Sequence, residues 1–529
     1  MAWAGIVAVT VGVLLHLPMY LAAADDGYRL AGMDVDAPML TGMVLIFAGL
    51  GLTAYGLFPR VGLAGRRGVA RVSVRPLDDA PINAAHVGLL LVMAAAVTID
   101  VMKPTTLAFV IPGFAGEYGL RSQANPAGHP AAALLPLAGI AGTVIGSLSW
   151  GWLGDRIGRR ASILLAGVLF AATAICGSMP SYQLNLVMCF VMGLGVGGML
   201  PIVFTLIAET IPSRHRGWLM VLIGGDVAGA YILTSWLSAT LVPEYSWRIL
   251  WLIGLPTGLL LIVLNRWIPE SPRFLLAHGR TEEARAVMAR YGADLVPDEN
   301  TDLAVEELVR SRFAQLFQRP LRRPTAVVVL LGLGIGLVSF GFQLWIPTNL
   351  RGLGYADVTA DRILRDSALI GFPLNFVVAA LYGLWSAKKT IVLLAGLTAA
   401  SLFAFAVAGD AVADDRTLLN ALLVVPIWGI SSMVAVLAAY SSEVYPTRVR
   451  SRGSGLAAAA SKAGGVVIIA IVVAAVAPPT ITGTALIGAI PMALAALAAA
   501  AFGIETRKRR LEQITAQEFE RAPPVGAQR

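Results

Sequence analysis

Two opposite charges stand inside an otherwise apolar stretch of this sequence. Asp100 and Lys103 lie within residues 87–111, and Pro104 follows immediately. Their i, i+3 spacing places both on one face of a helix, and the proline can interrupt the backbone hydrogen bonds beside them. A charge at bilayer depth costs about 2.5–3.5 kcal/mol on insertion scales, so it is retained mostly where it faces a cavity or a partner. We expect Asp100 to carry a proton and Lys103 to hold an anionic substrate, with a structural ion pair as the alternative.

Other polar residues interrupt the apolar stretches. Asp226 follows Gly224 and Gly225 and is a second candidate carboxylate for substrate or proton binding, with a hydrogen bond between packed helices as the alternative. Lys462 lies early in a late stretch, where snorkelling to the aqueous phase is favoured over pairing across a cavity. Three side-chain amides and one indole are further candidates for binding a substrate's hydroxyl or carboxylate groups: Gln343, Trp345, Asn349 and Asn375.

The stretches that carry these residues have the length of membrane spans. The chain is 57% hydrophobic and 14% charged, whereas soluble domains are about 25% charged. Apolar blocks of about 20 residues cross a bilayer as helices. We expect fourteen: 3–23, 39–58, 87–111, 132–152, 161–177, 184–208, 218–241, 249–267, 325–348, 367–385, 390–408, 418–440, 456–477 and 482–504. The first has no basic segment before it and is longer than the apolar part of a signal peptide, so we expect a retained helix.

Lys and Arg gather on alternate loops. Basic residues follow the second, fourth, sixth, eighth, tenth, twelfth and fourteenth spans, whereas Asp25, Asp26, Asp34 and Asp36 mark the other side. By the positive-inside rule the basic loops and both termini are cytoplasmic. The net charge of +8 then reflects topology, and we expect no nucleic-acid partner.

Two motifs in the basic loops are built for contacts between helices. The sequence ETIPSRHRG begins at Glu209, and EVYPTRVRSRG begins 234 residues later at Glu443, which indicates a duplicated unit. The loop GWLGDRIGRR, residues 151–160, combines glycines that permit a tight turn with an aspartate and arginines that can pair with charges on neighbouring helices. We expect this loop to latch the cytoplasmic side shut; the alternative is a basic turn that only sets topology.

These motifs resemble those of the major facilitator superfamily over residues 87–504. PESPRF at 269–274 and ETRK at 505–508 resemble its sugar-porter and synaptic-vesicle-protein-like metabolite:proton symporter branch. The resemblance implies alternating access by two six-helix halves and a cytoplasmic gate formed by Gly151, Gly154, Asp155, Arg156, Gly158, Arg159, Glu209, Arg214, Glu443 and Arg448. The second-half equivalent of the glycine-rich loop is degenerate, with Leu384 at the aspartate position. Cys189 replaces an arginine that many proton-coupled members carry, which excludes coupling through that arginine.

The predicted fold is therefore all-α and membrane-embedded, with two helices added before the major facilitator pattern. We expect the added helices and a basic linker at 1–83, the halves at 84–268 and 324–504, a cytoplasmic linker at 269–323, and a tail at 505–529. Within the linker we expect a short amphipathic helix at 281–291, capped by Thr281, and another at 306–317. No enzyme, cofactor or metal site is expected. GLGVGG at 193–198 lies inside an apolar span rather than after a strand, no GxxxxGK[ST] loop is present, and the five histidines are scattered.

The function that these residues favour is secondary active transport of a small polar metabolite across a cytoplasmic membrane. Lys103 favours an organic anion with proton coupling. The alternatives are a sugar or polyol porter, multidrug efflux and, outside transport, a membrane-embedded sensor or scaffold. The expected partners are the small-molecule substrate, protons and the lipid bilayer.

Overall fold

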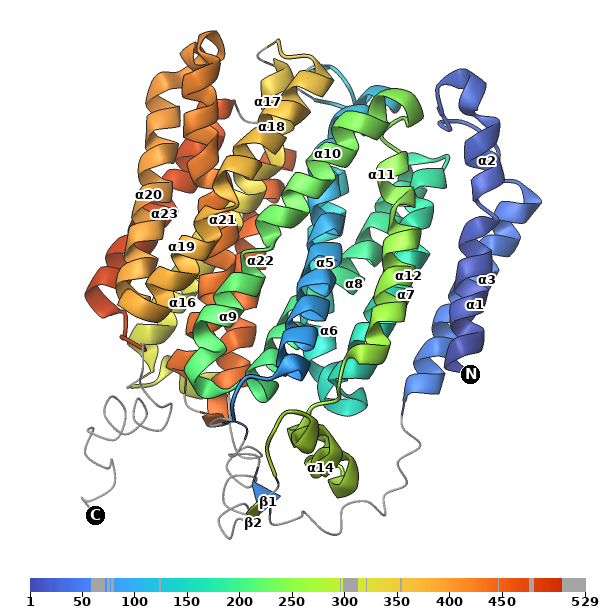
Figure 1. The fold of residues 1–529 in the computed structure, drawn as a ribbon. Helices are drawn as coiled ribbons and strands as arrows, with labels where there is room; N and C mark the ends of the chain where they lie inside the picture. The colour runs from blue at the N-terminus through green and yellow to red at the C-terminus, as the bar shows by residue number, and fades with distance from the viewer. Residues whose placement is uncertain are drawn as a thin grey trace, which may run out of the picture.

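Long helices run side by side through the molecule in this computed structural model (Figure 1). It describes residues 1–58, 72–73, 77, 80–122, 125–294, 296–297, 313–319, 321–352, 354–445, 447–474 and 480–506. Within them, thirteen helices are long and apolar enough to cross a membrane. The remaining expected span, residues 132–152, corresponds to helix α6 (Leu134–Ile157), of which Leu134–Ser147 is a shorter apolar stretch among the described residues.

The first half contains six membrane-spanning units, two of them interrupted. They are α5 (Ala84–Glu117), α6, α7 (Arg159–Ala172) continued by the 3-10 helix η3 (Thr173–Ser178), α8 (Tyr182–Thr210), α9 (Ser213–Gly224) with α10 (Val227–Tyr245), and α11 (Ile249–Leu252) with α12 (Gly254–Leu264). Side chains cap several starts: Asn83 and His86 form a capping box at α5, and Ser181 accepts a backbone hydrogen bond at α8.

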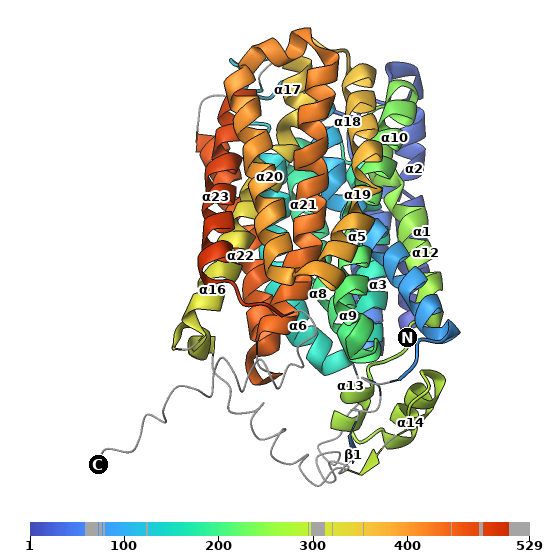
Figure 2. The same cartoon turned by 60° about the vertical axis from the view of Figure 1, so that its left-hand side comes forward.

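The second half repeats this arrangement. Its units are α16 (Arg322–Gly341) with η6 (Gln343–Trp345) and α17 (Ile346–Gly352), α18 (Asp357–Gly371) with α19 (Leu374–Ala380) and the π-helix η7 (Leu381–Trp385), α20 (Ala387–Ala408), α21 (Arg416–Val444), α22 (Thr447–Ala474) and α23 (Ile481–Phe502). Figure 2 brings α20, α21 and α23 forward. The broken seventh and eighth units carry Gln343, Trp345, Asn349 and Asn375, so these polar side chains lie near helix breaks.

Three α-helices precede the first half in the described part of the chain. Helix α1 (Ala2–Leu14) packs against α3 (Ala37–Leu57), with α2 (Leu17–Ala22) between them in the chain. Their approach is close, because a Cβ added at Gly12 would lie 2.7 Å from the carbonyl oxygen of Gly42. Both α1 and α3 pack on α7, on the side of the first half away from the second (Figure 1).

The chain between the halves forms a small cap on one end of the bundle. It contains α13 (Pro272–Ala277), α14 (Thr281–Arg290) and the 3-10 helix η5 (Phe313–Phe317), while β1 (Val72–Ser73) pairs antiparallel with β2 (Val296–Pro297). The predicted amphipathic helix is thus present as α14, but its N-cap is Arg280 and not Thr281. Of the second predicted helix, residues 306–312 lie outside the described part of the chain, and the remainder is η5.

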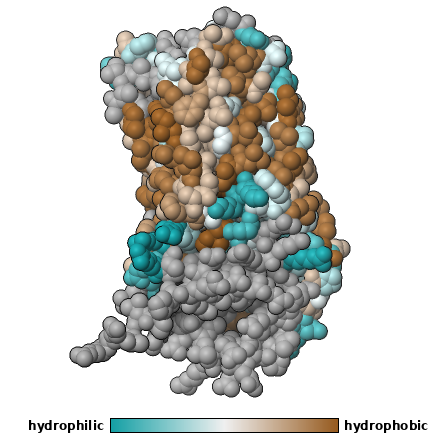
Figure 3. Space-filling model, turned by 90° about the vertical axis from the view of Figure 1, so that its left-hand side faces the viewer, coloured by the Kyte–Doolittle hydropathy of each residue, from teal (hydrophilic) through white to brown (hydrophobic). Residues whose placement is uncertain are grey.

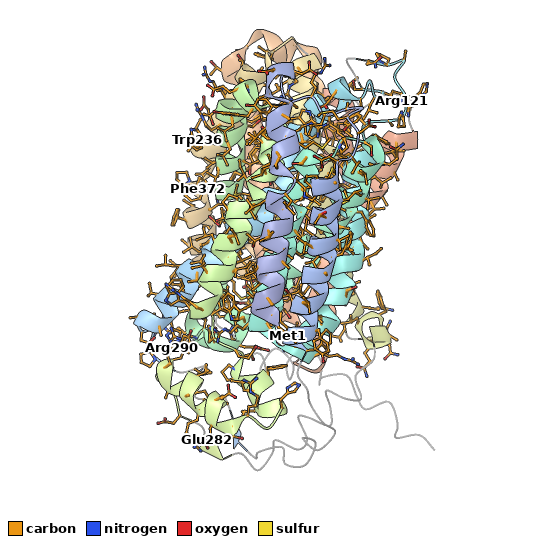
Figure 4. All side chains as sticks on the ribbon, turned by 90° about the vertical axis from the view of Figure 1, so that its right-hand side faces the viewer. Met1, Arg121, Trp236, Glu282, Arg290 and Phe372 are labelled. Atoms are coloured by element: carbon orange, nitrogen blue, oxygen red, sulfur yellow. The ribbon has the colours of Figure 1, made fainter. Side chains whose placement is uncertain are left out.

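Figure 4 distinguishes the two ends of the bundle. Met1, Glu282 and Arg290 lie at one end, which we call the basic end because it also carries Arg156 and Arg159. Arg121 lies at the opposite end. Between the ends, the surface in Figure 3 shows a broad hydrophobic belt with hydrophilic residues below it. The belt gives the molecule the surface of an integral membrane protein.

Candidate functional site

Asp100 lies buried near the middle of α5, between the two halves. Its side chain is 0% exposed, and neither carboxylate oxygen has a hydrogen-bond partner among the described residues. Lys462 of α22 carries the opposite charge and interacts with Asp100 electrostatically. A buried carboxylate without a hydrogen bond is costly, so this position requires a proton, a cation or a ligand.

Lys462 reaches into the first half. Its ammonium donates hydrogen bonds to Oγ of Ser147 in α6 and, at 2.8 Å, to the carbonyl oxygen of Gly197 in α8. All three residues lie near the middle of their helices. The prediction that Lys462 snorkels to the aqueous phase is therefore wrong. Its side chain hydrogen-bonds to polar groups of the other half and need not extend to water.

Lys103 faces a different part of the protein. Its side chain is 4% exposed, and its Nζ lies where a side chain at position 254 would be, since a Cβ added to Gly254 would come within 1.9 Å of it. Cys176 of η3 is an electrostatic neighbour, and Nζ has no hydrogen-bond partner among the described residues. No ion pair joins Asp100 to Lys103 in this part of the chain, although both lie on α5.

Asp226 marks the break between α9 and α10. Its Oδ2 accepts a hydrogen bond from the hydroxyl of Thr98 in α5. Gly225 beside it approaches the second half closely, because an added Cβ would lie 3.0 Å from Cβ of Asn375 in α19. The glycines thus admit a neighbouring helix, and the aspartate bonds to another helix of its own half.

The four second-half candidates are not gathered into one hydrogen-bonded cluster. Asn375 Oδ1 accepts a hydrogen bond of 2.7 Å from Ser432, and Asn349 Nδ2 lies 3.5 Å from Oγ1 of Thr484. The indole N–H of Trp345, Oδ1 of Asn349 and Nδ2 of Asn375 are buried with no partner among the described residues. Gln343 is half-buried in η6, which packs against α5. These unpaired donors and acceptors are capable of binding a polar ligand.

Arg159 lies at the basic end of the first half and contacts several of its neighbours there. Its guanidinium pairs with Glu209 at 3.5 Å and donates to the carbonyl oxygen of Gly154 at 3.1 Å. Gly158 makes the turn before it with φ +93°, and a side chain there would strike Glu270, because an added Cβ would lie 2.2 Å from its Oε2. The motif therefore needs glycine at position 158 for both backbone conformation and space.

Glu270 was not among the predicted gate residues, although it lies in the PESPRF motif. Its Oε1 accepts the backbone N–H of Arg159 at 2.7 Å and that of Ser271 at 3.0 Å. A carboxylate at the first turn of α7 satisfies free N–H groups and complements the helix dipole. Glu270, at the start of the linker, is thereby hydrogen-bonded to the gate motif.

Glu443 begins the second-half motif that corresponds to the one beginning at Glu209 in the first half. Its Oε2 accepts hydrogen bonds of 2.7 Å from the hydroxyls of Tyr382 and Thr506. Its Oε1 approaches α9 of the first half, because a Cβ added at Gly217 would lie 2.7 Å from it. Tyr382 immediately precedes the degenerate second-half loop, and its hydroxyl donates to the carboxylate of Glu443.

The structure describes less of the remaining predicted gate residues. Gly151 lies within α6, while Arg156 and Arg214 are exposed at the basic end. The side chains of Asp155 and Arg448 lie outside what the structure describes. The gate assignment therefore stays a prediction, with the contacts of Arg159, Glu209 and Glu443 in its favour.

The two halves also meet at the opposite end. Ser238 of α10 donates a 2.6 Å hydrogen bond to Oδ2 of Asp361 in α18, and Asp361 Oδ1 lies 3.5 Å from Nη2 of Arg351. Arg121 donates to the carbonyl oxygen of Val473 at 3.1 Å. Sequence reasoning missed Asp361, whose charge stands close to an expected span boundary. The halves are thus in contact at both ends, with Asp100 and Lys462 between them.

This fold and this interior define a membrane transporter of the major facilitator kind. The family model described as "Sugar (and other) transporter" matches residues 131–517, and the chain belongs to that family. It is a secondary transporter of small metabolites and not an enzyme. The predicted superfamily is thereby confirmed.

Relatives support the same family. The chain is 26% identical to the niacin transporter NiaP of Acinetobacter baylyi over 391 residues, covering 73% of this chain and 86% of that protein. It is 26% identical to the 4-hydroxybenzoate transporter PcaK of the same species over 398 residues, with 71% and 82% covered. The proton:xylose symporter XylE shares the fold, with a TM-score of 0.65, 18% identity, and coverage of 82% of this chain and 99% of XylE.

Proposed function

We propose that this protein moves a small organic anion together with a proton by alternating access of its two halves. The observation that carries this proposal is Asp100, a fully buried carboxylate without a hydrogen-bond partner among the described residues, opposite the cation Lys462. A group that must gain and lose a proton in an apolar interior needs such a site, and a cation nearby suits an anionic substrate.

The named relatives favour the same substrate class. Niacin and 4-hydroxybenzoate are aromatic carboxylates, and the proteins named as their transporters align with more than two thirds of this chain. We propose an aromatic or other small monocarboxylate here. The site would combine Asp100 with either buried lysine, with Asp226, and with Gln343, Trp345, Asn349 and Asn375.

Membrane topology belongs to the same proposal. We propose that both termini are cytoplasmic, that the basic end faces the cytoplasm, and that α1 and α3 are two additional spans held on the first half. The basic loops and the length of the two helices support this arrangement. Arg156, Arg159, Glu209, Arg214, Glu443 and Arg448, with Gly151, Gly154, Asp155 and Gly158, then form the cytoplasmic gate.

A sugar or polyol is the second candidate substrate. Oδ1 of Asn349 and Nδ2 of Asn375, which have no partner among the described residues, are suited to hydroxyl groups, and the XylE fold accommodates a sugar. Such a substrate would not require the lysines. The two candidate substrates therefore differ in whether binding requires a carboxylate group on the substrate.

Uptake into proteoliposomes tests the proposal. We expect nicotinate uptake to accelerate when the lumen is made alkaline relative to the outside, to collapse with a protonophore, and to fall at least about tenfold in Asp100→Asn, as for loss of a positioned proton carrier. Thr105→Val is the matched control on α5, because its hydroxyl bonds only within its own helix in the described contacts. Xylose uptake without nicotinate uptake would contradict the proposal, and no flux of either would favour a sensor or scaffold.

A further inference from the structure

We propose that Lys462 binds the carboxylate of the substrate. Asp100 balances the charge of Lys462 in the absence of substrate, and the substrate carboxylate takes over that role when it enters. This inference rests on the proposed function. It adds the residue that binds the substrate carboxylate and the balance of charges in the binding site. An ammonium has three N–H donors, and two are used by Ser147 and Gly197. The third is available for a carboxylate oxygen, and a charge-assisted hydrogen bond is the strong form of this contact.

The position of Lys462 favours it over Lys103. Lys462 belongs to the second half and bonds to α6 and α8 of the first, so an anion held by it lies on the boundary between the moving parts. Lys103 belongs to the first half and points towards Gly254 of the same half. Binding changes the relative stability of two conformations only if the ligand contacts them differently, and a boundary residue meets this condition.

Charge balance then links the substrate to one proton. Asp100 and Lys462 together are neutral when both are ionised. A monocarboxylate added to the pair leaves one uncompensated negative charge in a buried site, which is strongly unfavourable. Protonation of Asp100 removes that charge, and its side chain has no hydrogen bond among the described residues that would hold it ionised. Substrate and proton therefore enter together.

The other ionisable groups near Asp100 are already directed elsewhere. Lys103 on the same helix faces Gly254 and Cys176, and Asp226, at the break before α10, is bonded to Thr98. Cys189 of α8 donates to the carbonyl oxygen of Leu135 at 3.4 Å. Among the described neighbours, Lys462 is the charge that acts on Asp100.

A charged ligand and its uncharged analogue separate this role from general packing. Nicotinate and nicotinamide have nearly the same shape, and only the first carries a carboxylate. We expect Lys462→Ala to weaken nicotinate binding to the purified protein by about 10- to 100-fold, the usual effect of losing a hydrogen bond to a charged group, and to change nicotinamide binding far less. Lys462→Arg should restore part of the preference for the carboxylate, which also shows that the site is folded.

Lys389→Ala is the matched control, because this lysine lies at the start of α20 against Trp385, away from the pair. The preference of the parent for nicotinate should persist in it. Persistence of that preference in Lys462→Ala would overturn the assignment to Lys462 while leaving anion transport intact. If the parent binds no carboxylate and transports none, the proposed function fails and this inference fails with it.

Electrical measurements test the charge balance separately. Uptake of nicotinate with one proton moves no net charge, so an imposed membrane potential at equal pH should leave the initial rate unchanged. A rate that rises with an inside-negative potential would require more than one proton per anion. That result would overturn the one-to-one link between the substrate and Asp100.

Discussion

Glu270 and Glu505 hold the same position in the two halves of the protein. Glu270 follows the sixth unit of the major facilitator fold and accepts the backbone N–H of Arg159, the first residue of α7, at 2.7 Å. Glu505 follows the twelfth unit and accepts the backbone N–H of Ala387, the first residue of α20, at 3.0 Å. Each carboxylate thus caps the third helix of its own half, and the cap is duplicated together with the fold.

Removal of either cap should destabilise its half by a similar amount. Glu270→Ala takes away the acceptor for the N–H groups of Arg159 and Ser271, and loss of a helix cap costs about 0.5–2 kcal/mol. Glu505→Ala should have a comparable effect, although Ser386 remains as a cap of α20. Apparent melting temperatures in detergent measure both. An unchanged melting temperature in Glu270→Ala would show that this cap adds nothing to stability.

The pH dependence of stability should reveal Glu270. Burial raises the pKa of its carboxyl above the ordinary 4.5, while the N–H groups of Ser271, Arg159 and Arg160 and the charge of Arg159 oppose the shift. A raised pKa means that the folded protein binds the proton more tightly than the unfolded chain. Its contribution is then full below about pH 4.5 and is lost as pH rises through the raised value. We therefore expect the melting temperature of the parent, measured relative to that of Glu270→Gln, to fall as the pH rises from about 4.5 through the raised pKa.

Glu283 provides the opposite sign for the same experiment. Its hydrogen bond with Arg280 lowers the pKa of its carboxyl below 4.5, so its contribution is present above pH 4.5 and is lost as pH falls through the lowered value. Both side chains are exposed, so the effect is strongly screened. Melting temperatures of Glu283→Gln should therefore follow the parent closely above pH 5. A pH trend of the Glu270 kind in Glu283→Gln would contradict the assignment to Glu270.

A buried ion pair connects the N-terminal helices to the first half. Glu117 pairs with Arg248 at 2.7 Å, with side chains 5% and 0% exposed, and its Oε1 also accepts the backbone N–H groups of Leu30 and Ala31. Glu117→Gln would leave a buried guanidinium without its counter-charge, a change that costs about 3–5 kcal/mol. We expect a large fall in melting temperature, with Glu282→Gln of the exposed Arg285 pair as the unaffected control. Equal melting temperatures of these two variants would contradict this role.

The sequence predicts the spans well because the bilayer imposes a length and an apolar composition on each one. It also contains the signal for the two caps, since PESPRF and ETRK follow corresponding spans. The directions of side chains inside the bundle are harder to predict. Asp100 and Lys103 share a helix face by spacing, yet the space above Gly254, far away in sequence, draws the lysine aside. Lys462 likewise finds Ser147 and Gly197 only through the packing of the two halves.

The hydrogen bond from Ser238 to Asp361 joins the halves at the end opposite to the gate motif, so its loss should favour opening there. Ser238→Ala removes a hydrogen bond to the buried carboxylate of Asp361, and a bond to a charged acceptor contributes about 1.5–3 kcal/mol. If that bond breaks on opening, the open population should rise roughly tenfold or more, limited by saturation. Ser235→Ala is the control, because the Ser235 hydroxyl bonds to the carbonyl oxygen of Ile232 in its own helix.

Spin labels can measure this population. The exposed Trp236 of α10 and Ile370 of α18 provide sites on the two halves, and their replacement by cysteine preserves the buried contacts around Asp361. Pulsed distance measurements on the labelled pair should show a new, longer distance in Ser238→Ala that is rare in the parent and in Ser235→Ala. Because Asp361→Asn weakens the same bond without emptying its place, it should give an intermediate population. An identical distance distribution in all four proteins would show that this contact does not hold the opposite end closed.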